Sequence, residues 1–389
     1  MIRIAAAIAG VLGFAWAGGI AGVLAEPPAY VWQLPRGFPQ PLVPADNPVT
    51  VEKVVLGRHL FYDTRLSVDG TFSCASCHQQ KHAFADDKGR ALGVTGEFHA
   101  RGSMSLANVV YSPVLTWANP TVRRLEAQAL VPMYGEHPIE LGLVEQDETL
   151  IGRLRREPRY LELFAAAFPA DADPFTRVNV TGAIASFERT LLSGNSAYDR
   201  YRTRFEFDAI SAAAHRGEDL FFSDAVQCYR CHGGFNFTAT VDYLGKGFLP
   251  IEFHNTGLYN IDGKGGYPAL DTGVYAISGD PADMGRFKPP SLRNIAVTAP
   301  YMHDGSIATL EAVVAHYEVG GRKISDGPNK GSGADSPLKS ALVTGFTLIA
   351  GDRGDLVAFL ESLTDREFLA DPRFSDPWPS HSVPRPADR

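Results

Sequence analysis

Apolar residues return at helical spacing in several separate stretches of this chain. Between residues 51 and 61 they fall at Val51, Val54, Val55 and Phe61, one or two helical turns apart, which is typical of an α-helix with one buried face. The other stretches with this period are residues 151–155, 160–168, 178–192, 310–317 and 356–363. The pattern therefore predicts helices joined by long connections.

Capping residues and prolines indicate where these helices begin and end. Ser211 and Thr309 stand where a hydroxyl can cap a helix, and Gly194 can end the helix over 178–192. Segments rich in Pro, Gly, Asn and Asp separate the helices. We expect a proline-rich strap at 26–48, loops at 233–290 and 319–350, and an irregular tail at 371–389.

One pattern occurs twice. Gly57-Arg-His-Leu-Phe-Tyr62 precedes Cys74-Ala-Ser-Cys-His78, and Gly217-Glu-Asp-Leu-Phe-Phe222 precedes Cys228-Tyr-Arg-Cys-His232. Each copy is a helix ending in bulky residues, a loop and then a Cys-x-x-Cys-His motif, which indicates an internal duplication.

The repeated motif is the attachment signature of a c-type haem. Cys74 and Cys77, and again Cys228 and Cys231, would bind the haem vinyl groups, and the histidine that follows each pair would bind the iron. A disulfide leaves both histidines unexplained, and a zinc site would need further ligands at close spacing. The two motifs use all 4 cysteines of the chain. We therefore expect two covalent haem c groups, with His78 and His232 as axial ligands.

Composition fits a globular redox protein. The 389 residues are 45% hydrophobic, enough for two domains with their own cores, and the net charge of -8 disfavours nucleic acid as a partner. The duplication predicts an all-α fold of two cytochrome c-like haem domains packed against each other, with long irregular loops. We place the domains at residues 49–205 and 206–370.

The beginning of the chain has the features of an export signal. Residues 1–25 start with Met1-Ile-Arg3 and continue as an uncharged apolar run that ends in the small-residue pattern Val23-Leu-Ala25. This predicts a secretory signal peptide, although the run is also long enough to be an uncleaved anchor. Haem attachment fits export, so we expect a periplasmic protein with no membrane contact after cleavage.

The second haem has two candidate sixth ligands. Tyr317 lies on the apolar stripe of the helix after Thr309, formed with Leu310, Val313 and Val314. Its phenolate could bind iron, or it could be an ordinary core tyrosine. Met302 is the rival ligand, and spacing alone leaves the choice open.

The segments Pro289-Pro-Ser-Leu-Arg-Asn294 and Thr298-Ala-Pro-Tyr-Met-His-Asp-Gly305 resemble the C-terminal half of bacterial di-haem cytochrome c peroxidases. In that family a methionine ligates the electron-transfer haem, and the matching position here is Tyr317. Tyrosine there marks the MauG-like branch, whose members react with hydrogen peroxide and store two oxidising equivalents as a pair of ferryl haems. A hard phenolate stabilises high-valent iron better than a thioether, so the resemblance favours Tyr317 over Met302.

The resemblance also implies a catalytic set at the first haem. In the stretch from Thr116 to Pro132, Trp117 matches a tryptophan that lies between the two haems, and Gln128 matches a glutamine above the peroxide-binding iron. The acid-base glutamate matches Glu140, with Glu136 as the alternative. Glu140 would move the peroxide proton, Gln128 would hold the oxygen ligand and Trp117 would relay charge.

The family further binds calcium between the haems through two carbonyls and an asparagine. The carbonyls correspond to Thr298 and Pro300, whereas the asparagine position is Gly102, which has no side-chain ligand. A calcium ion is thus a possible cofactor whose ligand set is incomplete in this chain.

The likeness is strongest to the methanobactin-associated branch, MbnH and its homologues, over segments such as Leu34-Pro-Arg-Gly-Phe-Pro39 and Arg101-Gly-Ser-Met-Ser-Leu-Ala-Asn108. Those enzymes oxidise a tryptophan of a secreted copper-binding partner, MbnP, to kynurenine. MauG itself uses a surface tryptophan where this chain has Val226. The resemblance implies an MbnP-like partner. The alternatives are a peroxidase that takes electrons from a small cytochrome and a pure electron carrier.

Overall fold

The computed structural model describes residues 28, 30–249 and 251–379, and the expected signal peptide lies outside them. Helices are the main regular secondary structure of these residues, long loops connect them, and the two strands β1 (Lys323–Ile324) and β2 (Gly331–Ser332) are very short. The helices are α1 (Val51–Tyr62), α2 (Cys74–Cys77), α3 (Leu125–Tyr134), α4 (Asp147–Arg155), α5 (Pro158–Ala167), α6 (Arg177–Arg189), α7 (Ala197–Arg204), α8 (Ala212–Phe221), α9 (Tyr229–His232), α10 (Tyr275–Ser278), α11 (Leu310–Glu318) and α12 (Asp352–Ser362). The all-α prediction is confirmed.

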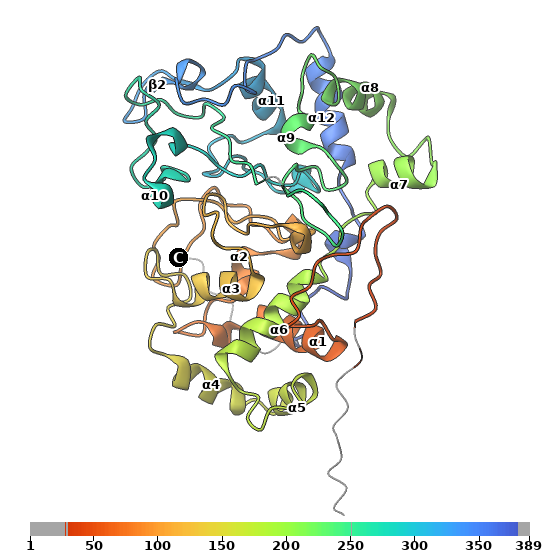
Figure 1. The fold of residues 1–389 in the computed structure, drawn as a ribbon, viewed down its shortest axis with the longest axis vertical. Helices are drawn as coiled ribbons and strands as arrows, with labels where there is room; N and C mark the ends of the chain where they lie inside the picture. Colours follow the sequence, from red (N-terminus) through yellow and green to blue (C-terminus); the bar gives the residue numbers. More distant parts are fainter. Residues whose placement is uncertain (1–27, 29, 250, 380–389) are drawn as a thin grey trace, which may run out of the picture.

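Two groups of helices are stacked along the long axis of the molecule (Figure 1). Helices α1 to α6 lie at one end and α7 to α12 at the other, each group around its own hydrophobic cluster. The chain then returns, because Phe368 and Phe374 belong to the cluster of the first group. The exact domain limits at 49–205 and 206–370 stay a prediction.

The duplication is visible as two equivalent helix crossings. Helix α1 packs on α6 and α8 packs on α12, and each crossing depends on a glycine. A Cβ atom on Gly57 would lie 1.9 Å from the Ala183 carbonyl oxygen, and one on Gly217 would lie 1.9 Å from that of Asp355. Both glycines therefore allow a backbone contact that any side chain would block.

The aromatic packing at the two crossings is equivalent as well. The rings of Phe61 and Phe187 lie 5.3 Å apart in the first crossing, and those of Phe221 and Phe359 lie 5.0 Å apart in the second. One ring of each pair, Phe61 or Phe221, lies at the end of the helix that precedes a Cys-x-x-Cys-His motif. The two crossings thus form the supports that hold the two motifs.

Most helix predictions are confirmed at their beginnings. Ser211 caps α8 by accepting a hydrogen bond from the Ala214 amide, and Thr309 caps α11 through the Ala312 amide. The predicted end of the 178–192 helix was wrong. Helix α6 ends at Arg189 because the carbonyl of Leu191 and the amide of Ser193 bind the main chain and side chain of Asn108 instead.

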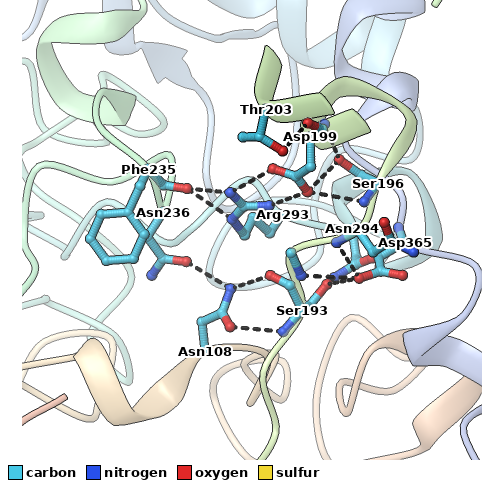
Figure 2. A network of polar contacts seen from close by, with 12 residues as sticks. Asn108, Ser193, Ser196, Asp199, Thr203, Phe235, Asn236, Arg293, Asn294 and Asp365 are labelled. Atoms are coloured by element: carbon cyan, nitrogen blue, oxygen red, sulfur yellow. Dashed lines mark hydrogen bonds and ion pairs between the residues drawn. The ribbon is translucent and has the colours of Figure 1, made fainter. Parts of the chain in front are cut away.

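A buried polar network joins the two halves (Figure 2). The Arg293 guanidinium forms an ion pair of 2.8 Å with Asp199, and both side chains are almost fully buried. Nearby, the Asp365 carboxylate accepts hydrogen bonds from the amides of Gly194 and Asn195, while its own amide donates to Asn294. The network ties the connection between α6 and α7 to Asn108 of the first half and to Asp365, just after α12, so it fixes how the halves meet. Over the residues that the structure describes, no helix is long and apolar enough to cross a membrane.

Candidate functional site

The first Cys-x-x-Cys-His motif forms α2 and faces the core of the first group of helices. Its sulfurs are not in a disulfide, and Cys74, Cys77 and His78 are each half-buried. The His78 Nδ1–H donates to the Phe84 carbonyl oxygen at 2.7 Å. That bond leaves Nε2 as the ring nitrogen available to a metal. Two free thiols and one oriented imidazole fit a covalently attached haem.

The second motif repeats this arrangement. Cys228 and Cys231 are unpaired, and the His232 Nδ1–H donates to the Pro290 carbonyl oxygen at 3.1 Å. Burial lowers the pKa of His232 to about 4, so its imidazole is neutral at ordinary pH, as a metal ligand must be. The donor set therefore fits haem at this motif as well.

Tyr317 lies beside the second motif. Burial raises the pKa of Tyr317, and the charges of the Cys231 and Cys228 thiols add to the shift, so the phenol lies within the electrostatic range of both. The neighbouring His316 is buried and its Nε2 bonds the Thr256 carbonyl oxygen at 3.0 Å, so it is held away from the motif. Met302, the rival ligand, packs against the second hydrophobic cluster.

Two glutamates lie near the thiols of the first motif. Burial raises the pKa of the Cys74 thiol, and the charges of Glu188 and Glu140 add to the shift. Glu140 acts on Cys77 too, where burial and Asp86 have the larger effects. The pKa of Glu140 is itself raised to about 7 by burial. Glu136, the alternative, is exposed. The structure thus brings Glu140 to the first motif and leaves Glu136 at the surface.

Glu188 is a site residue that sequence reasoning missed. It lies on α6, is 4% exposed, and its Oε2 has no hydrogen-bond partner among the described residues. Burial raises its pKa to about 8, against the opposing charge of Arg189. No sequence motif surrounds Glu188, so only the fold, which buries this part of α6, identifies it.

The segment that carries Gln128 is tied to Glu140. Gln128 is half-buried on α3, and the residues after Glu140 bond the end of that helix, since the Leu141 amide donates to Pro132 and the Leu143 amide to Met133. The Glu140 carbonyl in turn accepts from the Val94 amide at 2.8 Å. These bonds hold α3 and the Glu140 segment as one unit.

Trp117 lies where the two halves meet. Its indole N–H donates to the Gly102 carbonyl oxygen at 2.9 Å, and its ring packs against the second hydrophobic cluster. Lys288 holds the same segment, because its amide donates to the Trp117 carbonyl and its buried ammonium donates to Val114 at 2.7 Å. A tryptophan from the first half is therefore fixed against the second.

Gly102 also contacts the segment proposed to bind calcium. Its amide donates to the His303 carbonyl oxygen at 2.8 Å, a few residues beyond Thr298 and Pro300. The His303 ring pairs with Asp271 at 3.1 Å, and Arg101 pairs with the same carboxylate at 2.8 Å. Among the described residues no group of three or more His, Cys, Asp or Glu side chains could hold a metal ion.

Comparisons with known proteins agree with this geometry. A family model described as di-haem cytochrome c peroxidase matches residues 51–206. The methylamine utilization protein MauG of Methylorubrum extorquens is 35% identical over 85% of this chain and 82% of its own length. The cytochrome-c peroxidase IdrP1 of Denitromonas iodatirespirans is also 35% identical, over 84% of this chain and 85% of its own.

A solved structure shares the whole fold. It is described as a MauG-like protein associated with microbial copper homeostasis. The match has a TM-score of 0.88 and 46% sequence identity, and it covers 90% of this chain and 100% of that one. The structural and sequence comparisons therefore point to the same group of proteins.

Proposed function

The chain belongs to the di-haem cytochrome c peroxidase family, an oxidoreductase family that includes MauG, and from that premise we propose that it uses hydrogen peroxide to oxidise a side chain of a partner protein. The family carries two haem c groups and acts with peroxide on a partner protein or a cytochrome. The observation that carries the choice of a partner protein is the position of Tyr317 beside Cys228 and Cys231.

At the second motif, His232 and Tyr317 are proposed as the residues that would hold the haem iron. The haems, when bound, supply a store for the two oxidising equivalents of peroxide. An anionic oxygen ligand favours the higher oxidation states of iron, whereas a thioether favours the reduced state that a simple electron relay needs. Met302, packed in the hydrophobic cluster, is the less suitable candidate.

At the first haem, Glu140 is proposed to move the peroxide proton. Its pKa of about 7 allows the carboxyl both to accept and to release a proton near neutral pH. Gln128, on the helix tied to the Glu140 segment, is proposed to orient the bound oxygen through its side-chain amide. The bonds between the two segments keep these groups in a fixed relation.

Trp117 is proposed to carry charge between the haems. An indole fixed at the junction of the halves by bonds to Gly102 and Lys288 shortens the path that an electron must cover. A calcium ion bound by the carbonyls of Thr298 and Pro300 stays a prediction, because Gly102 offers no side-chain ligand.

The proposed partner is a secreted, MbnP-like copper-binding protein in which one tryptophan is oxidised to kynurenine. Two observations support this choice: the likeness to the methanobactin-associated branch and the 46% identity to a MauG-like protein associated with copper homeostasis. Family members are periplasmic c-type cytochromes, and a periplasmic location after removal of residues 1–25 is part of the proposal.

Mass spectrometry of candidate partners tests this proposal. Each partner is produced with this protein or with its Glu140→Gln variant and then digested. We expect a mass increase confined to one tryptophan-containing peptide, which is absent with the variant. Unmodified partners throughout, with peroxide present, would contradict the proposal.

A second function is favoured by the likeness to IdrP1, which is named as a cytochrome-c peroxidase. In that case the protein would reduce peroxide with electrons from a small cytochrome. Sustained turnover with a reduced c-type cytochrome would support this function. Oxidation of only a stoichiometric amount of that cytochrome would exclude it.

A further inference from the structure

Tyr229 connects the second attachment motif to the protein surface. It stands between Cys228 and Cys231 in the sequence, its ring packs against the second hydrophobic cluster, and it is half-exposed. Its phenol donates a hydrogen bond of 3.0 Å to the Asp224 carboxylate, which is exposed. The ring is therefore partly packed in the core of the second half and partly exposed to solvent, next in sequence to an attachment cysteine.

We propose that Tyr229, with Asp224 as its proton acceptor, is the surface site at which a partner protein's aromatic side chain is oxidised. The proposal rests on the function proposed above and names the surface residue through which electrons from the partner enter this protein. It assigns roles to two residues that lie outside the catalytic set predicted for the first haem.

The step is a proton-coupled electron transfer. One electron leaves the Tyr229 phenol toward the oxidised haem at Cys228 and Cys231, and the phenolic proton passes to the Asp224 carboxylate. An indole or phenol of the partner then returns one electron to Tyr229, and the proton moves back from Asp224. Each cycle removes one electron from the partner, so two cycles use the two equivalents of one peroxide molecule.

Two tryptophans, Trp117 and Trp378, are less suitable for this step because each has its indole N–H bound to a carbonyl in the protein. Trp117 lies at the junction of the two halves with its indole N–H bound to Gly102. Trp378 packs against the first hydrophobic cluster, where its indole N–H donates to the His59 carbonyl. Val226, just before the second motif, is buried and cannot be oxidised in this way.

The surface beside Tyr229 fits an aromatic side chain of a partner. The rings of Phe222 and Tyr229 lie 6.3 Å apart, and Phe222 is 40% exposed. Phe222 also lines a surface hollow of about 480 Å³. The other residues of the hollow are Tyr198, Tyr201, Arg202, Glu218 and Asp219. Apolar rings with charges of both signs around them favour an indole or phenol ring carried on a protein.

Radical trapping tests the site directly. The holoprotein is treated with peroxide and a nitroso spin trap and then digested, and the adduct is located by mass spectrometry. We expect the adduct on the peptide that contains Tyr229, in the native protein and in a Tyr243→Phe control. Tyr243 is a half-buried tyrosine of the same half, outside the motif. An adduct that stays in place in Tyr229→Phe would overturn the assignment.

Kinetics separate this inference from the proposed function. Tyr229→Phe keeps the ring and removes the phenol, and Asp224→Asn removes the proton acceptor. We expect both variants to slow reduction of the peroxide-treated protein by N-acetyltryptophanamide about tenfold or more. Both variants should still store two oxidising equivalents, as the native protein does. Storage of fewer than two equivalents by the native protein contradicts the proposed function. Full storage with an unchanged rate in Tyr229→Phe contradicts only this inference.

Discussion

At the residue scale, one carboxyl group, that of Glu140, is proposed to control the chemistry at the first motif. Glu140 is half-buried near both Cys74 and Cys77, and burial raises its pKa to about 7. Above that pH the group is a carboxylate that can accept the peroxide proton, and below it the group is protonated and cannot. The reaction with peroxide should therefore depend on the charge of this one side chain.

Replacement of Glu140 by glutamine should slow the reaction with peroxide by about 100-fold or more, since general acid-base catalysis typically contributes that much. In the native protein the rate should rise with pH through a midpoint near 7 and then level, because deprotonation creates the base. The variant should show no such rise. Stopped-flow absorbance at several pH values measures both.

The exposed Glu136 offers the matched control, because Glu136→Gln makes the same chemical change four residues earlier. It should leave the rate and its pH dependence as they are. If Glu136→Gln abolished the rise while Glu140→Gln preserved it, the acid-base role would belong to Glu136.

At the residue scale, the sequence predicts a site residue only when the residues that act with it are close to it in the sequence. The haem attachment residues lie within five consecutive positions, so the motif alone points to them. Glu188 was missed because it stands 114 positions from Cys74, and only the packing of α6 brings the two together. The pairing of Asp271 with Arg101 and with His303 was missed for the same reason.

At the scale of elements, the glycine crossings decide how closely helices approach. Gly217→Ala should destabilise the protein by about 1–3 kcal/mol, because the new methyl group would overlap the Asp355 carbonyl in the neighbouring helix. Thermal unfolding of the haem-loaded protein, followed by circular dichroism, measures the effect as a lower melting temperature.

Gly354→Ala is the control for this experiment. Gly354 lies in α12 of the same crossing, and nothing is within 4 Å of the position that its Cβ would take. Alanine there should leave stability unchanged or raise it by up to about 1 kcal/mol through helix propensity. Equal losses in the two variants would mean that the close approach is not what matters at Gly217.

Helices with a clear apolar period were predicted, and those without one were not. Helix α7 reads Ala-Tyr-Asp-Arg-Tyr-Arg-Thr-Arg, with Tyr198 and Asp199 as its buried residues, so periodicity could not reveal it. Helix α3 was missed because it contains Pro132, which normally interrupts a helix. Such helices depend on tertiary contacts, and the contact between α3 and α6 is an example.

At the scale of the whole molecule, the two halves share a duplicated helical framework but bring different side chains to their attachment motifs. The first motif faces two carboxyls with raised pKa values, Glu140 and Glu188, and the second faces the Tyr317 phenol. Trp117 and the Arg293–Asp199 network hold the halves together. The duplication could be predicted from the repeated motifs, whereas the network joins segments from five separate parts of the chain and only the fold shows it.

The central claim is that the Tyr317 oxygen faces the iron of the haem held by Cys228 and Cys231. Electron paramagnetic resonance of the resting diferric protein, compared with Tyr317→Phe, tests it most directly. The account predicts that the low-spin signal of the second haem is lost in the variant and replaced by a high-spin signal, while the signal of the first haem is retained. A spectrum unchanged by the substitution would contradict it.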